Sequence, residues 1–468
     1  MSAMIRTLRV ASVTCLALCF AAPRVSAQTD PSVVGQWASV APLQRYTTAL
    51  HLLPTGMVMS YSDGRKNDVR LWYPGTGTTT PISNSGYDLF CSGHAFLADG
   101  RLLFAGGHIA RQVGLPNSRT YDAASNRWAP GPNMNAGRWY PTATTLANGD
   151  VLVVSGSIDD NVGANPLPQV FQAPSGPWRD LTNAQLKLGL YPRMHLAPNG
   201  KVFNAAPGPT TRYLDTSGTG AWTVVAPRTY ARRGAGSSVM YDDGKVLVMG
   251  GDDPPTNTAE VIDLNASSPS WRAVESMAFA RRHLNATLLP DGKVLVTGGT
   301  RGPGSNNTST PVYAAEMWDP ATERWTTMAS AKTPRLYHSA ALLLPDGRVL
   351  TSGGDGIKQV EVYSPPYLFA GARPTIASAP AAVSYGQSFF VETADAASIA
   401  KVTWIRLGSV THSFDQNQRI NRLSFSQAPG GLNVVPPSDA NLAPPGDYML
   451  FVVNTNGVPS VASFVTVQ

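Results

Sequence analysis

The chain has 468 residues, of which 43% are hydrophobic and 14% charged, and it contains 43 Gly and 38 Pro. This composition supplies a large core and excludes both a disordered chain and a single small module. The formal net charge is +6, half of it from Arg6, Arg9 and Arg24, and no basic run comes after these residues. We therefore do not expect nucleic acid as a partner.

The first 27 residues have the order of a secretory signal peptide. Arg6 and Arg9 precede an apolar run at residues 10–22, and Ala27 ends a small-residue cleavage site. The run is too short to span a membrane, and no later segment reaches the ~18 apolar residues that a membrane helix needs. The sequence therefore predicts a signal peptide over residues 1–27, a secreted protein and no membrane segment.

Cleavage would leave one cysteine in the mature chain. Cys15 and Cys19 depart with the signal peptide, so Cys91 has no partner for an internal disulfide bond. Cys91 is then either a small buried apolar residue or a thiol kept for chemistry. The cysteine count alone leaves both interpretations open.

A sevenfold repeat fills most of the chain. Each unit has an apolar run, a glycine turn and a second apolar run; Asp-Gly or Asn-Gly, which forms six of the turns, is a strong hairpin signal. The turn glycines, spaced by 44 to 55 residues, are Gly56, Gly100, Gly149, Gly200, Gly244, Gly292 and Gly347. A third strand succeeds each hairpin, and a fourth strand with a tryptophan usually comes after that. Four strands per unit predict a seven-bladed kelch-type β-propeller over residues 28–366.

The two ends of the repeat predict how the ring closes and which domain comes after it. The seventh unit lacks a tryptophan strand, whereas residues 35–40, around Trp37, form an unattached one before the first unit. We expect this strand to complete the last blade and so to cover an exposed sheet edge. Beyond Pro366, short apolar segments alternate with Pro and Gly turns, which predicts an immunoglobulin-like β-sandwich over residues 367–468. The predicted fold class is all-β.

One position of each repeat is expected to face the axis of the ring. It lies nine residues before each turn glycine, at the start of the innermost strand, and is occupied by Thr47, Cys91, Tyr140, Tyr191, Ala235, His283 and His338. Taken singly, these side chains could simply bond to water. Taken together, Cys and His fit zinc, whereas oxygen and nitrogen ligands fit Cu(II). A further imidazole could come from His412, the only histidine of the second domain. The residue types do not choose between these metals.

Five segments resemble, in order and spacing, those of the copper radical oxidases, the relatives of galactose oxidase and glyoxal oxidase. Four of them match the family's ligand motifs: Phe90-Cys91-Ser92-Gly93-His94, Gly137-Arg138-Trp139-Tyr140-Pro141, Arg335-Leu336-Tyr337-His338-Ser339 and Thr411-His412-Ser413-Phe414-Asp415-Gln416. The fifth, at residues 360–376, resembles the family's entry into its C-terminal domain. The resemblance covers nearly all of the mature chain.

The resemblance implies a role for each of five residues. Cys91 would be joined through its sulfur to the ring of Tyr140, and this thioether-linked pair would be a redox cofactor that stores a radical. One copper ion per chain would be bound equatorially by Tyr140, His338 and His412 and axially by Tyr337. Tyr337 would also act as general base.

The resemblance also implies a reaction: two-electron oxidation of small aldehydes, as their hydrates, or of primary alcohols, with O₂ reduced to hydrogen peroxide. We expect no carbohydrate-binding domain ahead of the propeller. This expectation and the Arg-Trp-Tyr-Pro sequence around Tyr140 favour the glyoxal oxidase side. We expect a monomer. Trp139 is the nearest candidate for the aromatic side chain that stacks over the thioether in the family, with simple packing as the alternative.

The sequence is also compatible with two other functions. A non-catalytic kelch propeller could bind protein or polysaccharide, because a fold by itself proves no function. A zinc-dependent hydrolase would leave both tyrosines unused. Tyr191 and His283 match no ligand motif, so we expect them to bond to water in the channel. Asp415, Gln416 and Arg419 are expected to shape the loop of His412 through hydrogen bonds.

Overall fold

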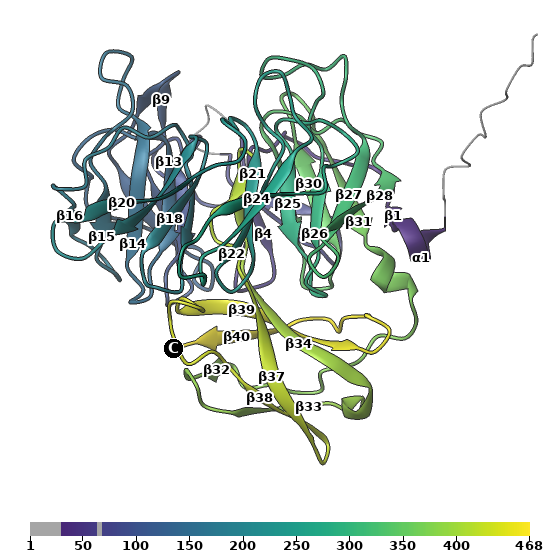
Figure 1. Ribbon diagram of the computed structural model, residues 1–468. Helices are drawn as coiled ribbons and strands as arrows, with labels where there is room; N and C mark the ends of the chain where they lie inside the picture. Colours follow the sequence, from purple (N-terminus) through teal and green to yellow (C-terminus); the bar gives the residue numbers. More distant parts are fainter. Residues whose placement is uncertain (1–29, 63–67) are drawn as a thin grey trace, which may run out of the picture.

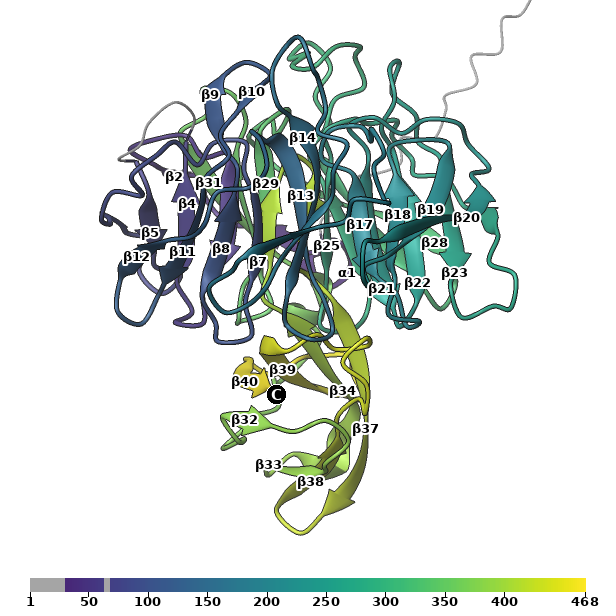
Figure 2. The ribbon, with the colours of Figure 1, turned by 90° about the vertical axis from the view of Figure 1, so that its left-hand side faces the viewer.

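The computed structural model describes residues 30–62 and 68–468, so the predicted signal peptide over residues 1–27 lies outside the described residues. Seven antiparallel sheets surround one axis, and a second β domain lies against one end of the ring (Figures 1 and 2). Only α1 (Pro31–Val34), η1 (Pro366–Phe369) and η2 (Ala396–Ser398) interrupt the strands of the described part. The expectation of an all-β propeller with a sandwich after it is confirmed.

Each of the first four blades contains four strands in chain order, as the sequence repeat predicts. Blade 1 contains β3 (Ala49–Leu52), β4 (Val58–Tyr61), β5 (Arg70–Trp72) and β6 (Thr79–Pro81). Blade 2 contains β7 (Gly93–Phe96), β8 (Leu102–Ala105), β11 (Ser118–Asp122) and β12 (Arg127–Pro130), with an extra hairpin of β9 (His108–Ala110) and β10 (Val113–Gly114). Blade 3 contains β13 (Trp139–Thr145), β14 (Val151–Ser157), β15 (Gln169–Phe171) and β16 (Trp178–Asp180). Blade 4 contains β17 (Arg193–Leu196), β18 (Val202–Ala206), β19 (Thr210–Asp215) and β20 (Ala221–Pro227).

The remaining blades complete the ring. Blade 5 contains β21 (Ser237–Asp242), β22 (Lys245–Met249), β23 (Ala259–Asp263) and β24 (Trp271–Val274). Blade 6 contains β25 (Asn285–Leu288), β26 (Val294–Thr297), β27 (Ala314–Asp319) and β28 (Arg324–Ser330). Blade 7 contains β29 (Ser339–Leu343), β30 (Val349–Gly353) and β31 (Gln359–Ser364), and its outer edge is β1 (Gln36–Trp37) with β2 (Ala41–Pro42).

The ring closes as the sequence predicts. In β1, Trp37 pairs with Tyr363 of β31, so an N-terminal segment supplies the missing outer strand of the last blade. The indole N–H of Trp37 also donates to the carbonyl of Ala329, 2.8 Å away on blade 6. The pairing removes a sheet edge that would otherwise face solvent.

The second domain is a strongly curved sheet that folds over its own core. Its strand order is β32 (Ala382–Val383), β40 (Ser463–Val467), β39 (Gly446–Asn454), β34 (Ile399–Arg406), β37 (Ile420–Ala428), β38 (Gly431–Val435) and β33 (Phe389–Glu392). Trp404 and Tyr448 pack 5.0 Å apart between ring centroids within that core. The other face of the same strands packs against the propeller, since Ile405, Ile420 and Phe451 belong to the main propeller core.

One hairpin of the second domain leaves the sandwich and enters the propeller. This axial hairpin (residues 409–419) contains β35 (Ser409–Thr411) and β36 (Phe414–Asp415), and β35 pairs with β3, the innermost strand of blade 1. It appears as a yellow-green strand inside the ring in Figure 1. The sequence did not predict that a strand of one domain extends a sheet of the other.

The axial hairpin is fixed by polar side chains that reach several blades. The Gln416 Oε1 accepts hydrogen bonds from the backbone N–H of Ala143 at 2.8 Å and of His94 at 3.3 Å. Gln418 bonds to blade 6, and Arg419 donates to the carbonyl of Leu196 on blade 4. The expectation that residues after His412 shape its loop through hydrogen bonds therefore agrees with the structure.

Four buried arginines hold the segments that lead to the axis. Each donates through Nη1 to a carbonyl at the end of the second strand of its own blade: Arg138 to Ser155, Arg233 to Gly250, Arg281 to Gly298 and Arg335 to Gly353. The third strands supply a polar partner to each, namely Gln169, Glu260, Glu316 and Glu361. Because buried charges are stable only when paired and hydrogen-bonded, these links fix the start of each inner strand.

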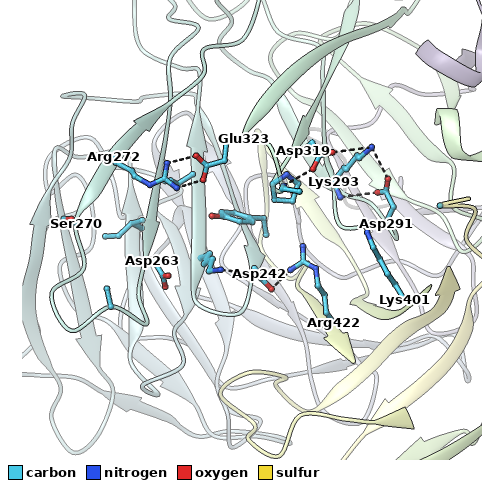
Figure 3. A pocket seen from close by; sticks show the side chains of 18 of the residues that line it. Asp242, Asp263, Ser270, Arg272, Asp291, Lys293, Asp319, Glu323, Lys401 and Arg422 are labelled. Carbon is cyan, nitrogen blue, oxygen red and sulfur yellow. Dashed lines mark hydrogen bonds and ion pairs between the residues drawn. The ribbon is translucent and has the colours of Figure 1, made fainter. Parts of the chain in front are cut away.

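A charged cleft with a volume of about 860 Å³ lies between blades 5 and 6 and the second domain (Figure 3). Arg422 forms an ion pair with Asp242, and the ammonium of Lys401 donates to the carbonyl of Asp291 at 3.1 Å. These contacts join the sandwich to the propeller. None of the axial residues that the sequence singles out lines this cleft.

Candidate metal centre

The seven axial positions predicted from the repeat come together at the end of the propeller that the axial hairpin reaches. Six of them have left-handed backbone conformations: φ is 64° at Cys91, 69° at Tyr140, 44° at Tyr191, 57° at Ala235, 60° at His283 and 62° at His338. Residues other than glycine rarely adopt this backbone conformation. Such strain persists where surrounding structure enforces it and is typical of functional sites.

Backbone hydrogen bonds between blades enforce this conformation. The N–H of Tyr140 donates to the carbonyl of Cys91, and the N–H of Tyr191 donates to that of Tyr140, both at 2.8 Å. The N–H of His283 donates in the same way to Ala235, at 2.8 Å. Five of the seven axial residues are thus linked in two runs along the channel, which fixes the height of their side chains.

Four side chains from three parts of the chain meet at one point. The hydroxyl of Tyr140 lies 2.5 Å from the hydroxyl of Tyr337, 3.3 Å from Nε2 of His338 and 2.9 Å from Nε2 of His412. Tyr140 comes from blade 3, Tyr337 and His338 from blade 7, and His412 from the tip of the axial hairpin. The structure therefore brings together all four residues that the family resemblance assigned to the metal.

Cys91 lies next to this group. Its side chain is buried and packs in one apolar cluster with Phe90, Trp139, Tyr140 and Tyr191. Burial raises the pKa of Tyr140, and a negative charge on Cys91 would raise it further. The thiol and the phenol predicted to be linked thus lie in the same cluster.

Both imidazoles turn Nε2 toward the meeting point and form a hydrogen bond through Nδ1. The Thr411 hydroxyl donates its proton to the carbonyl of Thr48 and therefore accepts the hydrogen bond from Nδ1–H of His412, at 2.7 Å. Nδ1 of His338 lies 2.5 Å from the carboxylate of Asp355, which can only accept. Hydrogen bonds at Nδ1 that leave the lone pair of Nε2 free are typical of metal-binding histidines.

Burial disfavours the charged forms of Tyr140, Tyr337 and His412. Burial, the nearby Cys91 and the nearby Tyr337 raise the pKa of Tyr140 well above its ordinary value. Burial likewise raises the pKa of Tyr337 to about 12, although its hydrogen bond with Tyr140 acts in the opposite direction. Burial and the neighbouring His338 and His283 lower the pKa of His412 well below its ordinary value.

The donor set fits a divalent transition metal. First-row metals lie roughly 2 Å from nitrogen and oxygen ligands, so adjacent ligand atoms stand about 3 Å apart, close to the separations of 2.5, 2.9 and 3.3 Å seen around Tyr140. A bound cation would supply the positive charge that the buried phenols lack and displace their protons. Two imidazoles and two phenols suit Cu(II). No group of three or more His, Cys, Asp or Glu side chains suited to a metal occurs within residues 30–62 and 68–468.

Three further aromatic residues surround the four donors. The indole of Trp139 stacks on the ring of Tyr140, with centroids 3.6 Å apart and planes at 11°. The ring of Tyr191 also stacks on Tyr140, with centroids 4.6 Å apart, and its hydroxyl donates to the carbonyl of Ser92 instead of to channel water. His283 lies 4.9 Å from Tyr337, and its Nε2 has no hydrogen-bond partner among the described residues.

Sequence reasoning missed three residues that support this centre. Asp355 comes directly after the Gly-Gly pair of blade 7 and bonds to His338. Arg193 donates to the carbonyl of His412, at 3.4 Å, and to the carbonyls of Tyr191 and Gly236. His108, in the extra hairpin of blade 2, accepts from Trp139. Only Arg193 carried a signal, since it lies two residues after an axial position.

Comparisons with known proteins extend over both domains. Residues 373–467 match the family model described as galactose oxidase-like, Early set domain, and residues 253–367 match the glyoxal oxidase N-terminus model. The chain is 31% identical to a galactose oxidase of Gibberella zeae, over 95% of this chain and 72% of that protein. It is 32% identical to aldehyde oxidase GLOX of Vitis pseudoreticulata, over 81% of this chain and 82% of that protein.

A solved structure agrees with these relatives. A fungal alcohol oxidase in complex with copper covers 93% of this chain with a TM-score of 0.85 and 28% identity, and all of that chain is matched. Fold, donor set and relatives thus agree on one class of protein, the copper radical oxidases. Within that class, the chain belongs to the family of galactose oxidase and glyoxal oxidase.

Proposed function

We propose that the protein is a secreted monomeric oxidase that converts small aldehyde hydrates to carboxylic acids, or primary alcohols to aldehydes, while reducing O₂ to hydrogen peroxide. Each turnover moves two electrons and two protons from the substrate to O₂. The observation that carries this proposal is the meeting of the Tyr140 hydroxyl with Tyr337, His338 and His412 within 3.3 Å. We divide the chain into a signal peptide (1–27), a propeller (28–366) and a C-terminal domain (367–468).

The four donors hold one copper ion. When bound, copper supplies a one-electron redox couple and a Lewis acid that acidifies the substrate hydroxyl. His338 and His412 bind through Nε2, and Tyr140 and Tyr337 bind through their hydroxyl oxygens. The hydrogen bonds from Nδ1 to Asp355 and Thr411 keep both imidazoles oriented for this role.

Cys91 and Tyr140 supply the second one-electron store. The sulfur of Cys91 bonds to a ring carbon of Tyr140; the S–H and C–H hydrogens leave as two protons and two electrons, which O₂ takes up as hydrogen peroxide. The sulfur substituent makes the phenol easier to oxidise. The thioether also attaches the ring of Tyr140 to the main chain a second time, through Cys91, and so fixes its position. Because Tyr140 is also buried among its neighbours, which exclude water, it can store a radical.

Tyr337 acts as the proton acceptor, and Tyr140 as the hydrogen acceptor. Tyr337 is half-buried at the mouth of the channel, where its oxygen can take the proton of the substrate hydroxyl. The oxidised Tyr140 then removes a hydrogen atom from the adjacent carbon. The proton and the hydrogen atom together carry away two protons and one electron, and the second electron of the two-electron oxidation would be taken up by the bound copper ion.

A hollow next to the axial residues of blades 4 to 6 and the names of the relatives bear on the substrate. A hollow of about 310 Å³ is bordered by Gly189, Gly234 and Arg282, which directly precede or closely flank axial positions. Relatives of this chain are named galactose oxidase and aldehyde oxidase. The Arg-Trp-Tyr-Pro sequence around Tyr140 resembles the glyoxal oxidase side, so we place small aldehydes ahead of galactose.

Mass analysis tests the covalent link directly. In copper-treated wild-type protein, the peptides that contain Cys91 and Tyr140 should be recovered as one species, two hydrogens lighter than their sum. Cys91→Ala should keep the fold, show the full mass and lose most peroxide production with small aldehydes, primary alcohols and galactose. Separate peptides at full mass in the active wild-type protein would refute the assigned cofactor. No link and no peroxide would favour the alternative of a non-catalytic binding propeller.

A further inference from the structure

The hairpin of β9 and β10 is an addition to blade 2 that stands over the metal centre. It lies between the second and third strands of the blade and rises above the propeller at the end opposite the second domain (Figures 1 and 2). Its tip is open to solvent, with Ile109 58% exposed. Its base carries His108, a histidine that is not one of the four metal donors.

His108 accepts a hydrogen bond from Trp139. The indole Nε1 of Trp139 lies 3.0 Å from Nδ1 of His108. An indole nitrogen can only donate, so Nδ1 of His108 is the acceptor, and the imidazole is neutral with its proton on Nε2. The bond joins blade 2 to the aromatic ring that lies against Tyr140.

The close, parallel stacking of Trp139 on Tyr140 requires a further interaction that holds the indole in place. Aromatic pairs prefer offset or edge-to-face arrangements, with centroids roughly 4.5–7 Å apart, over a face-to-face sandwich. The rings of Trp139 and Tyr140 lie 3.6 Å apart and nearly parallel, at 11°. A hydrogen bond at the far edge of the indole is a direct means of holding the ring in this plane.

His108 is itself fixed by the segment that leads to Cys91. Its backbone N–H donates to the carbonyl of Asp88 at 3.2 Å, and its ring meets Phe90 edge-on at 5.3 Å. Beside it, a Cβ at Gly114 would lie 2.3 Å from the backbone of Arg138, so the hairpin is wedged against the strand that carries Trp139. The position of His108 is therefore determined from both sides of the Cys91–Tyr140 pair.

We propose that His108 is a positioning residue that holds Trp139 flat over Tyr140 and thereby tunes and protects the radical on that ring. The inference rests on the proposed function. The hydrogen bond draws electron density into the indole, which stabilises an electron-poor ring beside it, and it prevents the indole from turning away and admitting water. Loss of the acceptor should therefore raise the reduction potential of the Tyr140 radical and shorten its lifetime.

Three variants separate the hydrogen bond from the packing. His108→Phe keeps an aromatic ring against Phe90 but has no acceptor. His108→Asn places its Oδ1 near the position of Nδ1 and keeps the acceptor. His108→Ala is a second variant without an acceptor, in case the phenylalanine ring disturbs the hairpin.

The first measurement uses metal-free protein labelled with 5-fluorotryptophan. The fluorine signal of Trp139 is assigned by its loss in Trp139→Phe. We expect this signal to shift in the Phe and Ala variants and to stay near its wild-type position in the Asn variant. An unchanged signal in all three variants would overturn the positioning role, whether or not the protein proves to be an oxidase.

The second measurement uses copper-loaded, oxidised protein in which mass analysis has verified the thioether. The radical's absorption band is monitored over time, and its midpoint potential is determined by redox titration. We expect a half-life about two- to tenfold shorter in the Phe and Ala variants, the range that one hydrogen bond spans, with a higher potential and with the Asn variant close to wild type. Equal lifetimes in all variants, or an Asn variant as impaired as Phe, would refute the inference. Absence of the thioether from wild-type protein would instead refute the proposed function and leave the fluorine result to decide the role of His108.

Discussion

Nε2 of His412 lies 2.9 Å from the hydroxyl of Tyr140, although 272 sequence positions and a domain boundary separate the two residues. His412 reaches this position because the axial hairpin runs up the channel of the propeller and pairs with β3. A metal centre assembled in this way forms only when both domains are folded and docked. The polar contacts of the hairpin are therefore part of the site.

Thr411 should control how well His412 binds metal. Its hydroxyl accepts from Nδ1–H of His412 and is buried, so Thr411→Val removes the contact with little change in shape. We expect copper affinity to fall about 10- to 100-fold, as is usual when such an orienting partner is lost. Competition titration against a chelator measures this. Thr411→Ser keeps the hydroxyl and should bind nearly as wild type; equal affinity in the valine variant would contradict the role.

Asp355 should act in the same way on His338. Its carboxylate accepts from Nδ1–H at 2.5 Å, which makes Nε2 a stronger donor to the metal. Asp355→Ala should lower copper affinity by about tenfold or more. Asp355→Asn keeps a neutral acceptor, so its copper affinity should lie between those of wild type and Asp355→Ala. Asn306→Ala is the matched control because it removes the other partner of Asp355 but leaves the carboxylate in place. A loss as large in the control would show that the effect is not specific.

The buried pair of Arg281 and Glu316 should contribute strongly to stability. Both side chains are fully buried, with Nη2 and Oε2 2.5 Å apart. Glu316→Ala leaves an unpaired guanidinium in the core and should cost about 3–5 kcal/mol of unfolding free energy. Glu323→Ala, which breaks the exposed pair with Arg272 in the cleft of Figure 3, should cost at most about 1 kcal/mol. Denaturant unfolding of both variants makes the comparison, and equal losses would contradict it.

Stability should fall as the pH drops below about 6.5. Burial, with Arg419 and Arg193 nearby, lowers the pKa of His195 to about 3. The contribution of His195 to the free energy of unfolding is complete above the pKa that this histidine has in the unfolded chain, near 6.5. It is lost between pH 6.5 and 3, because in this range only the unfolded chain takes up the proton. Each such histidine contributes a slope of about 1.4 kcal/mol per pH unit in this window.

His195→Gln tests that slope in metal-free protein. Glutamine can keep the hydrogen bond to Ser238 but does not titrate. Urea unfolding between pH 7 and 4 should therefore show a dependence on pH that is shallower by about 1.4 kcal/mol per pH unit than that of wild type. A parallel dependence would mean that His195 is protonated in the folded protein.

The sequence determined the features that repeat. The spacing of the turn glycines set the number of blades, and the position nine residues before each glycine located Cys91, Tyr140 and His338. This worked because every blade places the same position of its inner strand at the same height on the axis. The lone tryptophan strand around Trp37 likewise indicated how the ring closes. The motifs around His412 indicated that the second domain contributes to the site.

Tertiary structure decided how those side chains are held. Nothing local to Thr411 or Asp355 shows that they fix the tautomers of His412 and His338, because these bonds depend on where a hairpin and a loop meet other blades. His108 lies in an insertion outside the repeat, so its bond to Trp139 has no counterpart at an equivalent position. Periodicity reports what each blade has in common, whereas the reactivity of the centre depends on contacts between blades and between domains, and these exist only once the ring has closed around the axial hairpin.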